Sequence, residues 1–472
     1  MAENGSGAAR RVILYELNEV PWSIVDHYVA RRPGSTFAAL LRSARSETTI
    51  NRDRHGLQPW RTWPTFHTGL YCDDHNSFEL GQDPETIRGT PIWDAAEEAG
   101  LSVGLFGALQ SWPPHEPRHG GFYVPDTFAR SPATFPKSLE RFQSFNLAMT
   151  RENAFSATSP LNARRAALTG LDIVTRGLTP LAAAKLVRHV VRERRDARWK
   201  AARPMAQVLP AFDLYWRLHV RARPDLSIFF TNHVAGMMHR YWGDAIPEYS
   251  REHDYAPDDV FGHFVLEAMD LADHQLGKAV RYVDEHPDSV LMIASSMGQE
   301  AVPYDAMADC IVVRDAERLL SALGFPDAEA GLAMYPRTSV KLPDEARASD
   351  VKAALEQLKL DDDELFDHFH VEGKTVSWAV HARPVPDSTV TAAGSERTFD
   401  ELGLSIEERL GGGNTAYHIP EGILITYGRG IEPGRDREDV EVIEIAPRIL
   451  DVLGAAPELQ TRLSEAAERS PV

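Results

Sequence analysis

The chain has very little cysteine, because Cys72 and Cys310 are the only two in 472 residues and lie far apart. Two isolated cysteines exclude a disulfide framework and a cysteine-rich zinc module. The apolar stretch after Arg10 and Arg11 is interrupted at Glu16, which is too early for a signal peptide. We therefore expect the cytoplasm as the location.

Long hydrophobic runs and excess positive charge are also missing. No stretch approaches the roughly 20 consecutive apolar residues that a membrane span needs. The formal net charge is −19, which disfavours broad electrostatic attraction to nucleic acid or to anionic lipid. We expect neither a nucleic acid polymer nor a membrane among the partners. Hydrophobic residues make up 43% and charged residues 25%, and these typical values argue against general disorder.

Short apolar runs that end in polar turns alternate with helical patterns along much of the chain. The clearest runs are RVILYEL from residue 11, SVGLFGA from 102, DLSIFFT from 225, SVLMIA from 289 and GILITYG from 422. Strands that are apolar on both faces and alternate with helices predict an α/β fold, with a mostly parallel central sheet and helices on both faces. Ligands of such sheets bind at the carboxyl ends of the strands.

Two stretches break the alternation. Residues 151–222 are helical in pattern and locally basic, which fits either the solvated face of an inserted cap or a surface that attracts phosphate or a partner. Residues 306–404 mix short helical and strand-like segments and predict a small α+β insertion. The α/β core is then expected to combine residues 10–150, 223–305 and 405–460.

The stretch RTWPTFHTGLY, residues 61–71, presents hydroxyl groups around a proline. Thr65 is a candidate nucleophile, although threonine is a weak nucleophile unless a base or a metal activates it. A Pro-Thr turn taken alone is more often only a turn. The order of the segments around it therefore carries more weight.

That order resembles the alkaline phosphatase superfamily, and within it the type I phosphodiesterase/nucleotide pyrophosphatase branch. The resemblance rests on five pieces of sequence: TWPTFHTGLY, PIWDAAEEAGLSVGLFG, MHRYW, HIPEGILITYGRGI and IAPRILDVLG. It implies an alkaline phosphatase-like fold in which Asp and His side chains hold two divalent metals, usually zinc, while a Thr or Ser attacks phosphorus.

Only some of the site positions implied by the resemblance carry the expected residue type in this sequence. Thr65 matches the nucleophile and His418 matches the late metal-binding histidine. The remaining metal-binding positions fall on residues of other types: Asn18, Asn232, Ser296 and Met297. The histidine expected four residues after Asn232 is Gly236, whereas His239 fits the His-x-x-Trp tail. Neutral side chains do not replace the charge of a carboxylate at a cation, so we do not expect an intact two-zinc site.

Three interpretations remain open. In the first, the site is rebuilt around other groups: Glu19, His239 and His418 hold one divalent metal (zinc, manganese or iron), or the site works without metal by acid and base catalysis. In the second, the chain is an inactive pseudoenzyme or a binding module that holds an anionic small molecule or a partner. In the third, the fold assignment is wrong.

The first interpretation predicts a hydrolase or group transferase that acts on a phosphate, sulfate or similar anionic ester. Thr65 is the expected nucleophile, with His67 or His418 as the base. Polar groups that are buried without partners cost about 1 to 3 kcal/mol each, so their density at the strand ends favours a polar ligand. The residues expected to bind the anionic substrate are Asn18, Asn232, Ser296 and Gln299.

Overall fold

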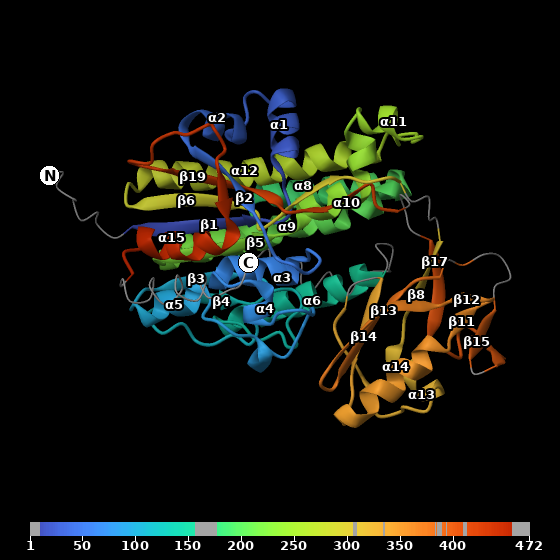
Figure 1. Cartoon of the computed structure of the whole chain (residues 1–472). Coiled ribbons are helices and arrows are strands. Elements are labelled where there is room, and N and C mark those ends of the chain that lie inside the picture. Colours follow the sequence, from blue (N-terminus) through green and yellow to red (C-terminus); the bar gives the residue numbers. More distant parts are fainter. Residues whose placement is uncertain are drawn as a thin grey trace. The chain divides into compact units, whose positions relative to one another are not determined.

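The computed structural model describes residues 10–155, 177–304, 309–333, 336–382, 384, 389–392, 394–408 and 413–455. The chain forms two compact units. The first contains the described residues 10–147, 177–304 and 414–455, and the second is built mainly from described residues between 309 and 413 (Figure 1).

An eight-stranded sheet forms the centre of the first unit, in the order β20-β2-β19-β6-β1-β5-β3-β4. The strands are β1 (Arg11–Leu17), β2 (Arg45–Ile50), β3 (Val103–Phe106), β4 (Gly121–Val124), β5 (Leu226–Thr231), β6 (Ser289–Ala294), β19 (Glu421–Gly428) and β20 (Asp439–Glu441). Strands β6, β1, β5, β3 and β4 run parallel, whereas β19 is antiparallel to both of its neighbours. The predicted α/β class with a mostly parallel sheet is confirmed.

Helices cover both faces of this sheet (Figure 1). One face packs against α3 (Pro59–Thr68), α5 (Ile92–Glu98) and α15 (Ile445–Val452) in a core that includes Leu14, Trp63 and Ile449. The other packs against α9 (Arg203–Ala222) and α12 (Phe264–Glu285): the Tyr15 ring contacts Phe212, and its hydroxyl donates to Gln275. Successive side chains of β1 therefore point into two different buried layers, as expected for a strand with helices on both faces of its sheet.

The remaining elements of the first unit lie around this core. They are α1 (Trp22–Arg31), α2 (Thr36–Ser43), α4 (Cys72–His75), α6 (Glu140–Phe155, whose last residues belong to the second unit), α8 (Pro180–Arg195), α10 (His233–Ala245), α11 (Tyr249–Glu252), β7 (Gly298–Ala301) and β18 (Ala416–Ile419). Strands β7 and β18 form a separate antiparallel pair. None of the helices in the described part of the chain is both long and apolar enough to cross a membrane.

The expected helical insertion, 151–222, is described only in part. Residues 156–176 lie outside the described residues, and α8 and α9 belong to the first unit. A short 3-10 helix, Ala197–Ala202, connects these two helices.

The second unit has a core of its own, centred on Trp378, Leu319 and Val351. It combines α13 (Ala316–Ala322) and α14 (Ala348–Glu356) with antiparallel strands: β8 (Asp309–Val313), β9 (Glu329–Ala330), β10 (Arg337–Lys341), β11 (Lys359–Leu360), β12 (Asp363–Glu364), β13 (Phe366–Glu372), β14 (Thr375–Val380), β15 (Val390–Ala392), β16 (Ser395–Arg397) and β17 (Leu404–Glu408).

Candidate functional site

Polar side chains gather where β1 and β6 end. Asn18 and Glu19 follow β1 directly, and Glu19 adopts a left-handed backbone conformation with φ 61°. This conformation is uncommon for a residue with a Cβ and costs on the order of 1 kcal/mol or more. Both side chains are almost fully buried. The structure therefore holds Glu19 in a strained turn at the carboxyl edge of the sheet.

Two histidines converge on the Glu19 carboxylate. Glu19 Oε2 lies 2.9 Å from Nε2 of His239 and 3.3 Å from Nε2 of His418. His239 is on α10, and His418 is on β18, where it pairs with Gln299 of β7. One ligand atom from each of Glu19, His239 and His418 lies within 4.8 Å of the other two. The three side chains predicted as metal ligands therefore form one cluster, which we call the Glu-His-His cluster.

The hydrogen bonds of the two histidines fix their ring orientation. Nδ1 of His239 donates to the carbonyl of Ala416 (3.0 Å), and Nδ1 of His418 donates to the carbonyl of Leu57 (2.7 Å). A neutral imidazole that donates from Nδ1 has a lone pair on Nε2. Two such lone pairs and a carboxylate oxygen would repel one another at these distances, so a proton or a metal cation must lie among them. This arrangement is also how proteins orient metal-binding histidines.

Side-chain amides hold the carboxylate from the other side. Asn18 Nδ2 donates to Glu19 Oε1 (2.8 Å) and to Asn232 Oδ1 (2.6 Å), and Gln299 Nε2 donates to Glu19 Oε2. Burial raises the pKa of Glu19, but the positive charges and hydrogen bonds of His418 and His239 outweigh it and hold that pKa well below its usual value. Glu19 is therefore a buried carboxylate that stays ionised. Asn232 is exposed, which gives the cluster an open side.

The residues around the cluster do not fit a second cation. The oxygen of Asn18 already accepts a hydrogen bond from Trp63 Nε1 (2.7 Å), and Met297 is buried in the core. Ser296 Oγ bonds to Thr62. The other group with metal-binding spacing among the described residues is Asp94, Glu97 and His115, and it shares no residue with the Glu-His-His cluster. The donor set fits one divalent ion and not the two-metal arrangement that the resemblance implies.

The hydroxyl of Thr62 faces the turn after β6. Thr62 Oγ1 lies 2.8 Å from Ser296 Oγ, and the neighbouring Trp63 contacts Asn18. Thr62 is fully buried and lies next to Ser296, which follows β6, on the first turns of α3. Backbone N–H groups in the first turn of a helix have no partner within the helix and favour negative charge nearby.

Thr65 lies on the same helix but belongs to another network. Its hydroxyl donates to Asp53 Oδ2 (2.7 Å) and lies 3.0 Å from His75 Nε2. His75 Nδ1 accepts from the backbone N–H of Ser77, so Nε2 carries the proton and donates to Thr65. Burial lowers the pKa of His75 to about 4 and raises that of Asp53. In this network His75 cannot serve as a base for Thr65, and no hydrogen bond in the described structure joins Thr65 to Asn18, Glu19 or Ser296.

His67 also lies apart from the cluster. Its Nε2 is 2.6 Å from Glu16 Oε1, and both side chains are almost completely buried. Its ring stacks on Trp63 at a centroid distance of 5.6 Å. Glu16 is on the α3 face of β1, and no hydrogen bond in the described structure joins His67 to either threonine. The geometry therefore gives no support to His67 as the base.

The sequence interpretation missed Thr62 and the partners of Thr65. A helix beginning at Pro59 would have placed Thr62 in the first turns, because proline is favoured at a helix start. That signal was present in QPWRTWPT. No signal in the sequence pointed to Asp53 or His75, since both contact Thr65 only through the tertiary structure.

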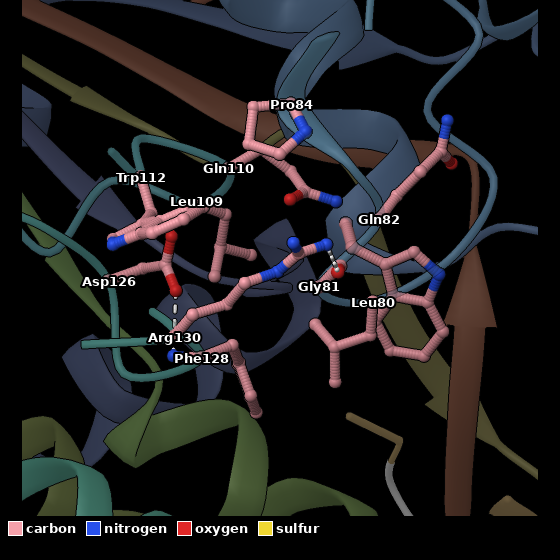
Figure 2. Close-up of a pocket in the computed structure, with 11 residues that line it drawn as sticks. Leu80, Gly81, Gln82, Pro84, Leu109, Gln110, Trp112, Asp126, Phe128 and Arg130 are labelled. Atoms are coloured by element: carbon pink, nitrogen blue, oxygen red, sulfur yellow. Dashed lines mark hydrogen bonds between the residues drawn. The ribbon is translucent and has the colours of Figure 1, made fainter. Parts of the chain in front are cut away.

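A small crevice lies on the β3 and β4 side of the same sheet edge (Figure 2). Trp60, Trp112 and Phe128 line it, and the guanidinium of Arg130 crosses it to donate to the carbonyl of Gly81 (3.2 Å). Its free volume of about 10 Å³ is the space that one water occupies. As it stands, this crevice does not hold an organic substrate.

A family of known proteins matches most of the chain. Residues 53–383 match the type I phosphodiesterase / nucleotide pyrophosphatase family. Because this match spans more than half of the chain, the chain belongs to that family. Membership supports hydrolysis of phosphoesters as the reaction class, and the family typically uses divalent zinc.

Solved structures give weaker likenesses. The chain is similar to murine ectonucleotide pyrophosphatase / phosphodiesterase 5, both alone and as an inactive variant in complex with AMP, and to the human protein of the same name. Each is 11% identical, and the alignments cover 95% of this chain and 96% of the other, with TM-scores of 0.41 to 0.42. Comparison with curated proteins gave no match.

Proposed function

We propose that this chain hydrolyses an anionic phosphoester at a site with one divalent metal, held by Glu19, His239 and His418, and with the Thr62 hydroxyl beside it. The observation that carries the proposal is the convergence of three acceptor atoms, Oε2 of Glu19 and Nε2 of both histidines, at 2.9 and 3.3 Å. Without a cation or protons among them these atoms repel one another. Two histidines and one carboxylate are a common donor set for zinc, manganese or iron.

When bound, the metal would supply a Lewis acid for a phosphoryl oxygen. The protein's own residues hold the ligands in place. The carbonyls of Ala416 and Leu57 orient the two imidazoles, and the amides of Asn18 and Gln299 orient the carboxylate. These outer contacts preorganise the site, which is what fixes affinity and geometry at metal centres.

Thr62 is the hydroxyl best placed to attack or to position the phosphoryl group. It lies next to Ser296, and the helix N-terminus that carries it favours an anion. The neutral amide of the exposed Asn232 faces the same edge of the sheet and does not repel an anion, as an aspartate would. This support favours Thr62 over Thr65 as the reacting hydroxyl. The expected substrate remains an anionic small molecule.

Metal content tests this proposal. We expect the protein, purified without chelator, to contain close to one zinc, manganese or iron per chain by inductively coupled plasma mass spectrometry. The variants Glu19→Gln and His239→Ala should lose at least tenfold in metal affinity, because each removes a ligand. Both should also lose hydrolysis of an activated phosphodiester.

His381→Ala is the matched control. His381 is an exposed histidine that pairs with Asp367 at 2.8 Å in the second unit, so its loss should change neither metal content nor hydrolysis. Two metals per chain would contradict the single-metal arrangement. Full metal binding without any turnover of phosphate or sulfate esters would instead support the binding module.

A further inference from the structure

Helix α8 exposes several large apolar side chains, whereas a helix that packs on a core usually buries them. Eight large hydrophobic side chains are exposed in the described part of the chain, and four of them are on α8. They are Leu181 (48% exposed), Val187 (64%), Val190 (48%) and Val191 (40%). The last three follow the i, i+3, i+4 spacing of a single helix face. A soluble surface helix normally turns such a face inward.

Besides the buried Ala182, the inward side of α8 carries ion pairs. Arg192 pairs with Glu267 of α12 at 2.7 Å, and its guanidinium lies 4.0 Å from the centre of the Trp199 ring. His189 pairs with Glu193 at 2.8 Å, and Glu193 pairs with Arg203 at the start of α9. The helix is therefore anchored by ion pairs and leaves its aliphatic stripe uncovered among the described residues.

Three arginines accompany the aliphatic stripe. Arg188, Arg194 and Arg195 are exposed, and no described residue forms an ion pair with them. Arg194 continues the face of Val187 and Val190, one turn further along. An aliphatic stripe with flanking arginines, on a chain of net charge −19, is a local exception to the charge of the whole molecule.

We propose that the outer face of α8 docks on an anionic lipid surface. The aliphatic side chains enter the interface between headgroups and acyl chains, while the arginines stay at the level of the lipid phosphates. Each basic residue near such a surface contributes to the attraction. The exposed aliphatic side chains lie along a single helix, which fits a fluid lipid surface better than it fits a preformed protein groove.

Two other occupants are less favourable. Residues 156–176 contain three arginines and one aspartate, so they carry the same sign of charge as Arg188, Arg194 and Arg195. A second copy of the chain would bring the same three arginines towards their equivalents. The four aliphatic side chains expose on the order of 300 Å², against about 800 Å² per partner in a standard interface.

Vesicle flotation at low salt tests the proposal with the full chain. We expect binding to vesicles of equal parts phosphatidylcholine and phosphatidylglycerol, and no binding to phosphatidylcholine alone. Replacing Arg188, Arg194 and Arg195 by Gln should weaken binding about 100-fold, since each charge contributes roughly a factor of five. The double variant Val187→Asp with Val191→Asp should abolish binding, because it removes the apolar contact.

Matched controls use exposed residues elsewhere in the first unit. Val220→Asp changes a valine that is 46% exposed on α9, and the triple change of Arg31, Arg42 and Arg88 to Gln removes the same charge. Both controls should bind like the parent chain. Equal binding to neutral vesicles, no binding to either, or loss of binding in the controls would overturn the proposal. So would a dimer in sedimentation that Val187→Asp dissociates.

Discussion

Thr62 and Thr65 lie three residues apart on one helix, yet their hydroxyl groups have different partners. Thr62 bonds to a neutral serine hydroxyl, Ser296. Thr65 bonds to the carboxylate of Asp53 and to His75. A hydrogen bond to a charged group stabilises a protein by about 1.5–3 kcal/mol, against about 0.5–1.5 kcal/mol for a neutral pair. The two residues should therefore differ in what their loss affects.

Replacing each threonine by the isosteric valine separates these roles. We expect Thr65→Val to lower the free energy of unfolding by about 2 kcal/mol, because the Asp53 carboxylate loses a buried donor, while hydrolysis per folded molecule stays near that of the parent. Thr62→Val should lower the free energy of unfolding by about 1 kcal/mol, because the buried Ser296 hydroxyl loses its partner, and should reduce hydrolysis at least 100-fold. Urea unfolding and turnover of an activated phosphodiester measure the two effects. The reverse pattern would return the nucleophile to Thr65.

At the scale of elements, the site depends on the close approach of β7 and β19. An added Cβ at Gly298 would lie 2.1 Å from the carbonyl oxygen of Glu421, so only glycine fits there. Gly298 precedes Gln299, whose amide holds the Glu19 carboxylate. Helix α10 has the opposite situation at Gly236, where a Cβ would meet nothing within 4 Å.

These two glycines give a matched pair of variants. Gly298→Ala should destabilise the protein by about 2 kcal/mol or more and weaken metal binding, because β7 must shift and carry Gln299 with it. Gly236→Ala should stabilise the protein by about 0.5–1 kcal/mol, since alanine is the better helix former and the space is open. Its metal affinity should stay unchanged. Thermal unfolding and metal titration of both variants check this, and an unchanged metal affinity in Gly298→Ala would remove Gln299 from the site.

At the scale of the whole molecule, buried histidines set the response to acid. Burial lowers the pKa of His75, His219 and His233 to about 4 in each case. The unfolded chain binds protons at these histidines near the ordinary value of about 6.5. Between pH 6.5 and pH 4 these histidines are protonated in the unfolded state but not in the folded state. Their contribution to the free energy of unfolding therefore falls as the pH drops through this range. Burial raises the pKa of Asp126 to about 6. The contribution of this carboxyl group to the free energy of unfolding therefore rises as the pH drops.

The variant His219→Gln measures the pH-dependent contribution of one of these histidines to the free energy of unfolding. His219 is almost fully buried and bonds to Ser227 through Nδ1. We expect the variant to have a lower free energy of unfolding than the parent at pH 7. At pH 4.5 this difference in free energy should be smaller by about 2 kcal/mol, because only the parent has a buried histidine that is protonated on unfolding. Urea unfolding at several pH values provides the measurement, with the exposed His381→Gln as background. A difference that does not change with pH would contradict the assignment.

The fold class and the strand-end positions of several polar residues could be predicted from the sequence. Apolar runs such as SVLMIA become strands buried on both faces, since alternation with helices leaves few other arrangements. Residues that directly follow those strands must meet at one edge of a parallel sheet. For this reason Asn18 and Glu19, predicted from the turn after the first strand, lie beside Asn232.

Which side chains face one another within that edge depends on the tertiary packing. The pairing of β18 with β7 brings His418 to Gln299, and the hydrogen bonds of α3 separate Thr62 from Thr65. The exposed aliphatic side chains of α8 could not be predicted either. A helical pattern indicates which residues share a face, but it does not indicate which face meets the core. Side-chain contacts between distant segments depend on the packing of the whole chain, and no local pattern encodes them.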